Sequence, residues 1–244
     1  MTSGDACETQ DIGARRYNPG SRSVLSRCDV RRFPDQTLFH RIGRLLCDAN
    51  CLPRKELYES WELARRARRR FRGGRVVDLC AGHGLTAWIM LILDPTSPEA
   101  CIVDTRIPPS AARIAAELGR AFPAVAARIR VEQADLGAFP LYETDVVVAA
   151  HACGALTDRI LDRAVAARAR VGVLPCCQDA RTCDTGGLQG WLDVPLAIDV
   201  TRAARLRHAG YAIHTQRIPA AITPKNRLLL AEPQGGAASE TTRA

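Results

Sequence analysis

The stretch VVDLCAGHGLTA, residues 76–87, decides the fold that this sequence predicts. An apolar run carries Asp78, the glycines Gly82 and Gly84 follow, and an apolar segment with helical character then begins. Glycine tolerates positive φ and lets a ligand approach bare backbone, while the first turn of a helix presents free N–H groups. The stretch therefore predicts a strand, a ligand-binding turn and a helix, which together open an α/β sheet.

Strand-like and helix-like segments alternate regularly from this stretch toward the end of the chain. Such alternation indicates a parallel, doubly wound sheet, which two further strand-like pieces close. We therefore expect an α/β fold with a Rossmann-like, seven-stranded, mostly parallel sheet. The expected strands cover residues 75–79, 100–104, 129–133, 145–150, 171–175, 211–218 and 227–231. The expected helices of this sheet cover residues 85–93, 110–122, 156–168 and 198–209.

The chain ahead of the first strand has a different composition. Residues 1–35 are polar and predict a loosely ordered leader. Apolar residues at helical spacing follow over residues 36–72, which we expect to form a small N-terminal helical appendage of basic character. The α/β domain is then expected over residues 73–232, and a flexible tail over residues 233–244.

The excess positive charge lies entirely in the first part of the chain. The net charge is +8, and residues 1–75 hold 17 basic and 9 acidic side chains, while the remaining residues hold 17 of each. A basic region on a neutral domain favours a polyanionic partner such as RNA, bound through the Arg65–Arg72 face. The alternative is an arginine bias of genome composition, since only Lys55 and Lys225 are lysines. No motif that reads a DNA sequence is found.

Targeting signals and cysteine usage bear on the compartment. Arg15 and Arg16 precede any apolar stretch, so no signal peptide is expected. The longest mostly apolar run, residues 85–93, is too short to span a bilayer, so no membrane partner is expected. Ten cysteines without a secretory signal indicate a reducing, cytoplasmic location and free thiols.

Three acidic residues follow or end successive strands in register with the glycines. They are Asp78, Asp104 and Asp135. Gly82, Gly84 and Ala87 satisfy the pattern of a dinucleotide site, but a carboxylate at Asp78 disfavours a pyrophosphate and suits a ligand with an ammonium group. S-adenosylmethionine carries an ammonium, a sulfonium and a ribose but no phosphate, and it fits this pattern better. An acidic residue placed like Asp104 accepts hydrogen bonds from ribose hydroxyls.

Residues 73–232 resemble the class I S-adenosylmethionine-dependent methyltransferases. The resemblance rests on these glycines and acidic residues and on the closing strand pair. It implies that the cofactor is S-adenosyl-L-methionine, with Asp78, Gly82 and Gly84 at its methionine end. It further implies contacts of Asp104 with the ribose and of Asp135 with the adenine. The chain departs from the family's pattern at Cys80, where the family often has glycine.

A second junction follows the expected fourth strand, in the sequence HACGALTD (151–158). The fifth strand leads into PCCQ (175–178), and the ends of these two strands flank the reacting centre of a doubly wound sheet. The candidate catalytic residues are therefore His151, Cys153, Cys176 and Cys177. In one interpretation they shape the acceptor pocket and His151 assists deprotonation of the nucleophile.

Three other interpretations of this junction stay open. One cysteine could attack a pyrimidine ring covalently. A metal could be bound by Cys177 and Cys183 with Cys153 or His151, although no metal is assigned. Alternatively, the cysteines act as small buried hydrophobic residues.

The motifs H-x-C-G-x-x-T-D and P-C-C resemble a branch of methyltransferase-like proteins. That branch includes the glutathione S-transferase C-terminal-domain-containing protein and is similar to tRNA acceptor-stem 2′-O-methyltransferases. The resemblance implies methyl transfer from S-adenosylmethionine to RNA, such as tRNA or rRNA, or to protein. The alternatives are a non-catalytic module that senses S-adenosylmethionine or thiol redox state, and an NAD-dependent oxidoreductase.

Overall fold

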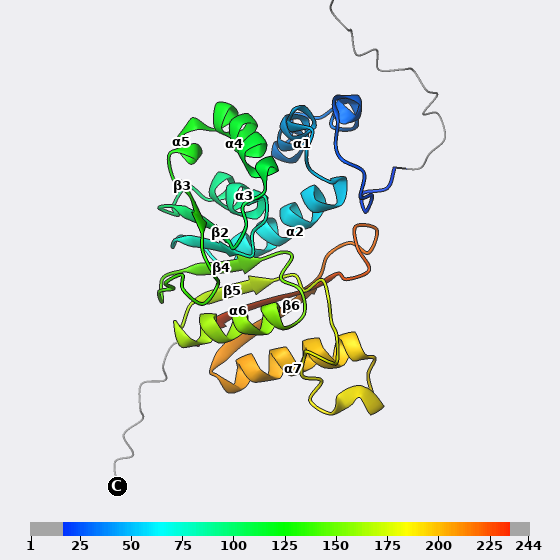
Figure 1. Cartoon of the computed structure of the whole chain (residues 1–244), viewed down its shortest axis with the longest axis vertical. Helices are drawn as coiled ribbons and strands as arrows, with labels where there is room; N and C mark the ends of the chain where they lie inside the picture. The colour runs from blue at the N-terminus through cyan, green and yellow to red at the C-terminus, as the bar shows by residue number, and fades with distance from the viewer. Residues whose placement is uncertain (1–16, 235–244) are drawn as a thin grey trace, which may run out of the picture.

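The computed structural model describes residues 17–234, which form one seven-stranded sheet with helices on both faces (Figure 1). The strand order is β3-β2-β1-β4-β5-β7-β6, and β7 is antiparallel to both β5 and β6. The strands are β1 (Val76–Leu79), β2 (Ala100–Asp104), β3 (Ile129–Gln133), β4 (Val146–Ala149), β5 (Arg170–Val173), β6 (Tyr211–Arg217) and β7 (Arg227–Pro233). The expected α/β, seven-stranded, mostly parallel sheet is confirmed.

The central strands β1 and β4 are apolar except for Asp78, because both faces of the sheet are covered. All residues of β1 and β4 are buried, as in parallel sheets with helices on either side. Within the ladder Val76 pairs with Ala100 of β2 and with Val146 of β4. This register brings the carboxyl ends of the parallel strands to one edge of the sheet, where the candidate site lies.

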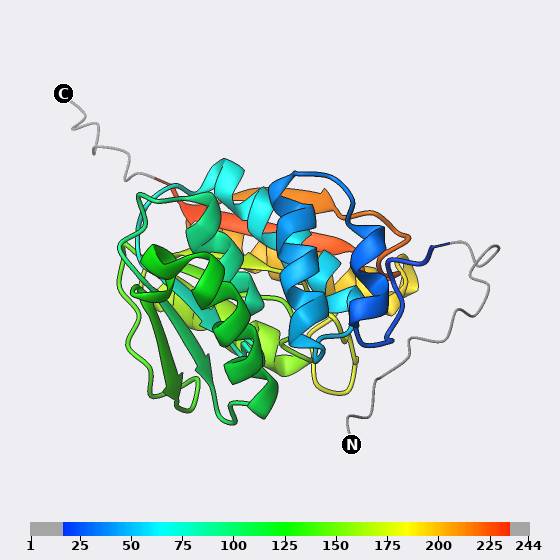
Figure 2. The same ribbon diagram turned by 90° about the horizontal axis from the view of Figure 1, so that it is seen from above.

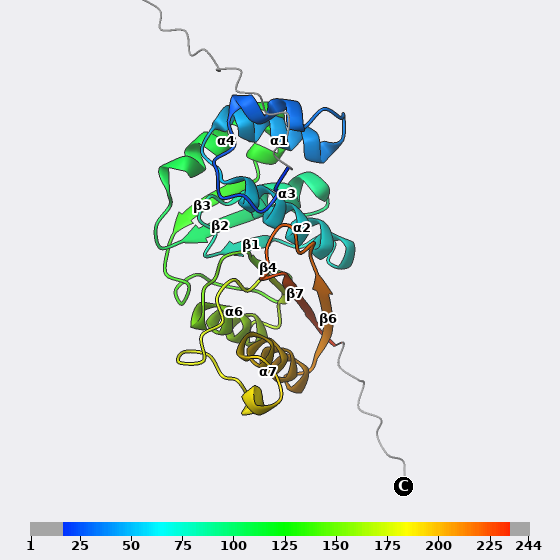
Figure 3. The same cartoon turned by 90° about the vertical axis from the view of Figure 1, so that its right-hand side faces the viewer.

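Two helical layers sandwich the sheet (Figure 3). One layer holds α1 (Leu38–Ala49), α2 (Arg54–Arg70), α3 (Leu85–Leu93), α4 (Pro109–Ala121) and the short α5 (Pro123–Ala126). The other layer holds α6 (Ala155–Ala166) and α7 (Val194–His208). Even-numbered β1 and β4 residues such as Val76 and Val146 face the first layer, and their neighbours Val77 and Val147 face the second. The sheet therefore has a separate hydrophobic core on each face.

The helices ahead of β1 belong to the first of these cores. Leu57, Leu63 and Ala67 of α2 are fully buried in the cluster that contains the strands. α1 lies beside α4 (Figure 2), where the guanidinium of Arg41 donates to the carbonyl of Ala121 at 3.0 Å. The domain boundary expected at residue 73 stays a prediction, but α1 and α2 share their hydrophobic core with the sheet.

The expected leader is only partly within the described residues. Residues 1–16 lie outside them, whereas Arg27–Arg32 form a 3-10 helix, η1, and Leu25 and Phe33 on either side are buried. The N–H of Leu25 donates to the carbonyl of Leu52 at 2.8 Å, which ties this segment to the start of α2. Of the expected tail, β7 extends to Pro233, and residues 235–244 lie outside the described part.

Three further expectations can be compared with the structure. The helix expected at 198–209 begins at Val194, because Asp193 caps it by accepting from the N–H of Leu196 at 2.9 Å. Free thiols are confirmed at eight cysteines, but the expectation is wrong at Cys28, which is disulfide-bonded. Within residues 17–234, no helix has both the length and the apolar character needed to cross a bilayer.

Candidate functional site

A cavity of about 330 Å³ lies at the carboxyl edge of the sheet. It is lined from the ends of β1, β2 and β3, from the segment after β4, and from the first turn of α6. Four residues singled out from the sequence line it together: Asp104, Asp135, His151 and Cys153. Its volume falls in the range of small-molecule and cofactor sites.

The turn after β1 is closed by Asp78 and Gly84. The Asp78 carboxylate, 2% exposed, accepts a hydrogen bond from the N–H of Ala87 at 3.2 Å, in the first turn of α3. Gly84 caps α3 with φ of 71°, and a Cβ at this position would approach Ile102 to 2.4 Å. Cys80 has φ of 55°, a left-handed conformation in which the glycine usual in the family would be unstrained.

The environment of Asp78 favours its protonated form in the absence of a cation. The pKa of Asp78 is raised to about 8, chiefly by burial and also by the neighbouring Asp104, while the hydrogen bond from Ala87 opposes this shift. A ligand ammonium placed beside this carboxylate would favour its ionised form. The α3 N-terminus, where a dinucleotide would place its phosphates, is already occupied by this carboxylate, which argues against an NAD site.

Asp104 and Asp135 follow at the ends of the next two strands. Asp104 accepts hydrogen bonds from the N–H groups of Gly82 at 2.9 Å and Arg106 at 3.1 Å. Asp135 is exposed and accepts from the N–H of Gly137 at 2.6 Å. Each carboxylate oxygen has two lone pairs, so both side chains keep acceptor positions for a ligand. Gly82 has φ of 53° and open space where a Cβ would be, so a ligand can approach its backbone.

Sequence reasoning missed the first two turns of α2. A small cavity adjoins the larger one through the shared residues Cys80 and His151, and Glu56, Ser60 and Asp78 line it as well. Glu56, Glu59 and Ser60 stand at positions i, i+3 and i+4 of a helix whose later turns are rich in arginine. This acidic and polar stripe on one face of the helix is the feature of the sequence that indicates that the start of α2 belongs to the site.

Glu56 joins three elements around the glycine turn. Its Oε2 lies 3.2 Å from Nε2 of His83, and Nδ1 of His83 lies 2.7 Å from Oγ of Ser110 in the first turn of α4. Burial alone would raise the pKa of Glu56, but the hydrogen bond with His83 and the nearby His151 outweigh it, so this pKa is lowered. The chain of three polar groups holds α2, the turn after β1 and α4 together beside the cavity.

His151 lies between the two cavities, which places it at the centre of the site. Its Nε2 is 4.0 Å from Oε2 of Glu59, whose side chain is 3% exposed. The other oxygen of Glu59 pairs with Nζ of Lys55 at 2.7 Å, while Oε2 has no hydrogen-bond partner among the described residues. Glu59 therefore presents a buried carboxylate oxygen toward the imidazole of His151.

The structure brings three of the predicted cysteines together. The sulfur atoms of Cys153, Cys176 and Cys177 all lie within 4.8 Å of one another, and Cys153 and Cys176 are 2.9 Å apart. Cys183 lies instead beside Arg202, with its sulfur 3.5 Å from the guanidinium. Burial raises the pKa of Cys153 and of Cys176. A covalent role for one of these thiols stays a prediction.

The Arg65–Arg72 face lies at the other edge of the sheet. Arg68 is buried and pairs with Asp94 at 3.3 Å, ahead of β2, and Arg70 pairs with Glu232 near the end of β7. Arg65 and Arg66 both pair with Glu62. The run therefore does not line the cavity, and its exposed members are Arg69, Arg70 and Arg72. Contact of RNA with these side chains stays a prediction.

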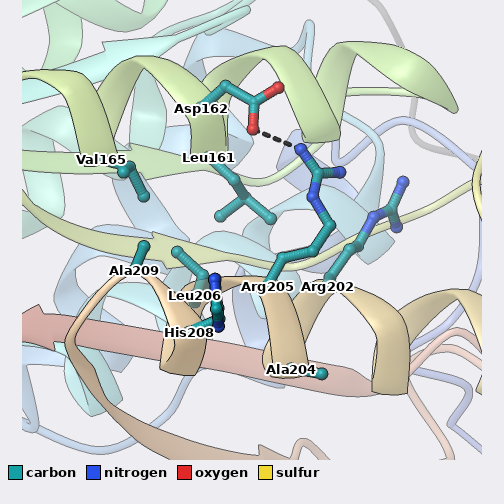
Figure 4. A pocket seen from close by; sticks show the side chains of 9 residues that line it. All are labelled: Leu161, Asp162, Val165, Arg202, Ala204, Arg205, Leu206, His208 and Ala209. Carbon is teal, nitrogen blue, oxygen red and sulfur yellow. Dashed lines mark hydrogen bonds and ion pairs between the residues drawn. The ribbon is translucent and has the colours of Figure 1, made fainter.

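A larger cavity of about 470 Å³ lies between α6 and α7 (Figure 4). Its lining is aliphatic apart from Arg202, His208 and the ion pair of Arg205 with Asp162, which the figure shows reaching from α7 to α6. None of the residues predicted to hold the cofactor or to act in catalysis lines it. The convergence of acidic residues, histidines and thiols at the carboxyl edge identifies that edge as the candidate site.

Comparison with known proteins agrees with this fold. An O-methyltransferase family protein from Burkholderia thailandensis superposes with a TM-score of 0.51 and 17% identity, over 87% of this chain and 64% of that chain. The S-adenosylmethionine-dependent methyltransferase SibL superposes with a TM-score of 0.47 and 19% identity, over 86% of this chain and 66% of that chain. The tRNA methyltransferase TrmK from B. subtilis superposes with a TM-score of 0.49 and 17% identity, over 71% of this chain and 66% of that chain. This chain thus spans less than two thirds of the Burkholderia protein, and the likeness establishes the fold. No curated protein matches.

The fold and the family match identify the domain as one of the class I methyltransferase type. Residues 55–184, just over half of the chain, match the family described as "Methyltransferase domain", and the chain belongs to that family. The matched segment begins at the first turn of α2 and ends just beyond Cys183, so it contains the cavity and the three clustered cysteines.

Proposed function

We propose that this protein transfers a methyl group from S-adenosylmethionine to an RNA acceptor. The observation that carries the proposal is the placement of Asp78, Asp104 and Asp135 at the ends of three adjacent strands around one site. Family membership implies the cofactor, and the geometry supports it. A cytoplasmic location and kinship with the branch that carries H-x-C-G-x-x-T-D and P-C-C motifs belong to the same proposal.

The residues of the two cavities fit the parts of this cofactor. The buried Asp78 suits the ammonium group, the backbone of Gly82 suits a close approach, and Asp104 has acceptor positions for ribose hydroxyls. Asp135, beside the apolar Leu136, suits an adenine amino group. When bound, the cofactor supplies an electrophilic methyl group on a sulfonium centre.

The role of the protein in such a transfer is alignment and exclusion of water. Methyl transfer is an in-line displacement, so holding the acceptor atom opposite the leaving sulfur accounts for much of the acceleration. His151 lines both cavities, which supports a position for it beside the methyl group and the acceptor. We assign it to the acceptor side of the site, where replacement with alanine should slow methyl transfer and leave the affinity for the cofactor unchanged.

Calorimetry separates the cofactor hypotheses. Titration with S-adenosylmethionine and, in a parallel cell, with NAD should show heat of binding for S-adenosylmethionine alone. Binding of NAD in place of S-adenosylmethionine would contradict the proposal and favour an oxidoreductase.

Labelled methyl transfer identifies the acceptor. Incubation with total RNA and with total protein in separate reactions should label RNA. The matched control is Asp162→Asn, a change in a surface ion pair of α6 that lines neither site cavity. Label in protein alone would overturn the RNA assignment, and cofactor binding without any transfer would favour the sensor hypothesis. Binding of the labelled RNA should weaken steeply with salt if arginines contact its phosphates.

A further inference from the structure

Three thiols from two separate loops meet beside the cavity. Cys153 follows β4, whereas Cys176 and Cys177 follow β5, and all three sulfur atoms lie within 4.8 Å of one another. Cys176 and Cys177 are adjacent in the sequence, so their side chains need not point to the same place. The fold nevertheless directs both of these sulfur atoms toward Cys153.

Packing does not account for this cluster. Buried cysteines of this protein, such as Cys47 and Cys101, behave as small apolar residues inside the hydrophobic cores. By contrast, Cys153 and Cys177 are exposed, and Cys176 is partly buried. Three thiols gathered at a surface that opens on a ligand cavity require another explanation.

The two loops that carry the thiols are held rigidly to each other and to α7. The N–H of Gly154 donates to the carbonyl of Cys177 at 3.1 Å. Arg202, 1% exposed, donates to the carbonyl of Gly154 at 3.0 Å and pairs with Asp158 at 2.7 Å. On the other loop, Gln178 donates to Asp199 of α7 at 3.2 Å. The buried guanidinium and its carboxylates thus fix both loops, as the residues around a metal site do.

We propose that Cys153, Cys176 and Cys177 form a binding site for Zn²⁺, with its fourth coordination position open to the cofactor cavity. Thiolates are the ligands that Zn²⁺ prefers, and three protein ligands leave one position for water or a substrate atom. Cys153 is the member of the cluster that also lines the cavity, so the open position faces that side. The inference goes beyond the proposed function, because the cation would bind whether or not methyl transfer occurs.

The geometry needs only a small adjustment. Zn–S bonds of about 2.3 Å in a tetrahedron place the sulfur atoms about 3.8 Å apart. The Cys153 and Cys176 sulfur atoms, now 2.9 Å apart, would separate by about 1 Å, a movement within the reach of side-chain rotation. Lys225, which faces Cys153, would partly compensate the net negative charge of three thiolates around one divalent cation.

Metal titration tests the site directly. The full-length, reduced, metal-free protein is titrated under argon first with Co²⁺ and then with Zn²⁺. We expect one Co²⁺ per chain, a thiolate-to-cobalt absorption band, the d–d bands of a tetrahedral ion, and displacement of Co²⁺ by Zn²⁺. Addition of a small thiol should shift the d–d bands, because the fourth position is open.

Single variants locate the ligands. Cys153→Ser, Cys176→Ser and Cys177→Ser should each lower the affinity for Co²⁺ by at least about 10- to 100-fold and reduce the thiolate band by about one third. The matched controls are Cys51→Ser, a partly buried thiol on the other side of the fold, and Cys183→Ser. Both should bind Co²⁺ as the parent protein does, and thermal unfolding verifies that each variant is folded.

Three results would overturn the proposal. The first is absence of Co²⁺ and Zn²⁺ binding to the folded, reduced parent protein. The second is loss of binding in Cys183→Ser with retention in Cys176→Ser, which would move the site to the other set of thiols. The third is a Cys153–Cys176 disulfide that forms in air, detected by a mass loss of about 2 Da, while the reduced protein takes up no metal.

Discussion

The carboxylate of Asp104 accepts a hydrogen bond of 2.9 Å from the backbone N–H of Gly82. The bond joins the end of β2 to the turn that follows β1, so the two elements expected to contact ribose and methionine are fixed to each other. Because the carboxylate still has acceptor positions, a ligand can bind this pair without displacing the bond.

Replacing Asp104 with alanine should weaken cofactor binding. The variant loses both the acceptor for the ribose and the bond that orients the turn at Gly82. A hydrogen bond to a charged group contributes about 1.5–3 kcal/mol, so we expect the Kd for S-adenosylmethionine to rise about 10- to 100-fold. Calorimetry measures this change, with Asp162→Ala as the surface control. An unchanged Kd would remove Asp104 from the cofactor site.

Gly82 and Gly84 should respond differently to alanine. Both have positive φ, but a Cβ at Gly84 would approach Ile102 to 2.4 Å, whereas a Cβ at Gly82 meets no atom within 4 Å. We expect Gly84→Ala to lower the free energy of unfolding by about 2–4 kcal/mol through strain and overpacking. Gly82→Ala should cost about 1 kcal/mol of stability but should raise the Kd for the cofactor, because its methyl group projects where the ligand approaches. Urea denaturation and calorimetry of both variants test the contrast, and equal stability losses would contradict it.

The buried Asp78 makes stability depend on pH. Its pKa is raised from 3.8 to about 8 in the folded protein, so folding binds a proton over this range. The stabilising effect of the protonated form is fully present below pH 3.8 and is lost as pH rises through about 8. The melting temperature of the ligand-free parent protein should therefore fall between about pH 4 and about pH 8 by more than that of Asp78→Asn, which thermal unfolding measures. A parallel pH dependence of both proteins would contradict the assignment.

Cofactor binding should then release a proton near pH 7. The ligand ammonium favours the ionised form of Asp78, so the carboxyl group must lose its proton on binding. Calorimetry in buffers of different ionisation enthalpy counts the protons released. Asp78→Asn should show no such release and a higher Kd, while a pH-independent count in the parent protein would exclude this coupling.

Arg202 should be among the most important charged residues for stability. It pairs with Asp158 at 2.7 Å and with Asp199 at 3.3 Å while almost fully buried. Arg202→Ala removes the buried cation between these carboxylates, although Asp158 keeps Arg205 at 3.5 Å and Asp199 keeps Arg227 at 2.6 Å. We expect a loss of about 3 kcal/mol in unfolding free energy, the lower end for breaking a buried ion pair. The matched control is Arg205→Ala on the same helix. Arg205 forms an exposed ion pair with Asp162, so this variant should lose less than about 1 kcal/mol in unfolding free energy. Chemical denaturation compares the two, and similar losses would show that Arg202 has no special role.

The strands of the sheet could be predicted because their hydrophobic pattern is local. The apolar runs that form β1, β2 and β4 are buried on both faces. The start of α7 was placed four residues late because the segment between Cys176 and Val194 has no periodicity. Its boundary depends on the side-chain cap of Asp193, which acts within a single turn.

The candidate site could be predicted only where it lies at strand ends. Asp78, Asp104 and His151 follow directly from the topology of an open sheet. The place of Glu59 could not be predicted in this way. The net charge of α2 indicates a basic surface, whereas its first turns are acidic and face the cavity. The pairing of Arg68 with Asp94 was equally invisible, since a sequence does not show which arginines become buried.

α2 connects the two edges of the sheet, and this has a consequence for how ligands enter and leave. The helix has 17 residues, about 25 Å in length, with Glu59 beside the cavity and Arg68 anchored at the far edge. A hinge motion of α2 would expose the hydrophobic core, so this helix forms an immobile rear wall. We therefore expect ligands to enter and leave past the first turn of α6, where the exposed Leu156 and Arg159 line the cavity. Amide hydrogen exchange should be slow in α2 and respond to the cofactor chiefly at that entrance.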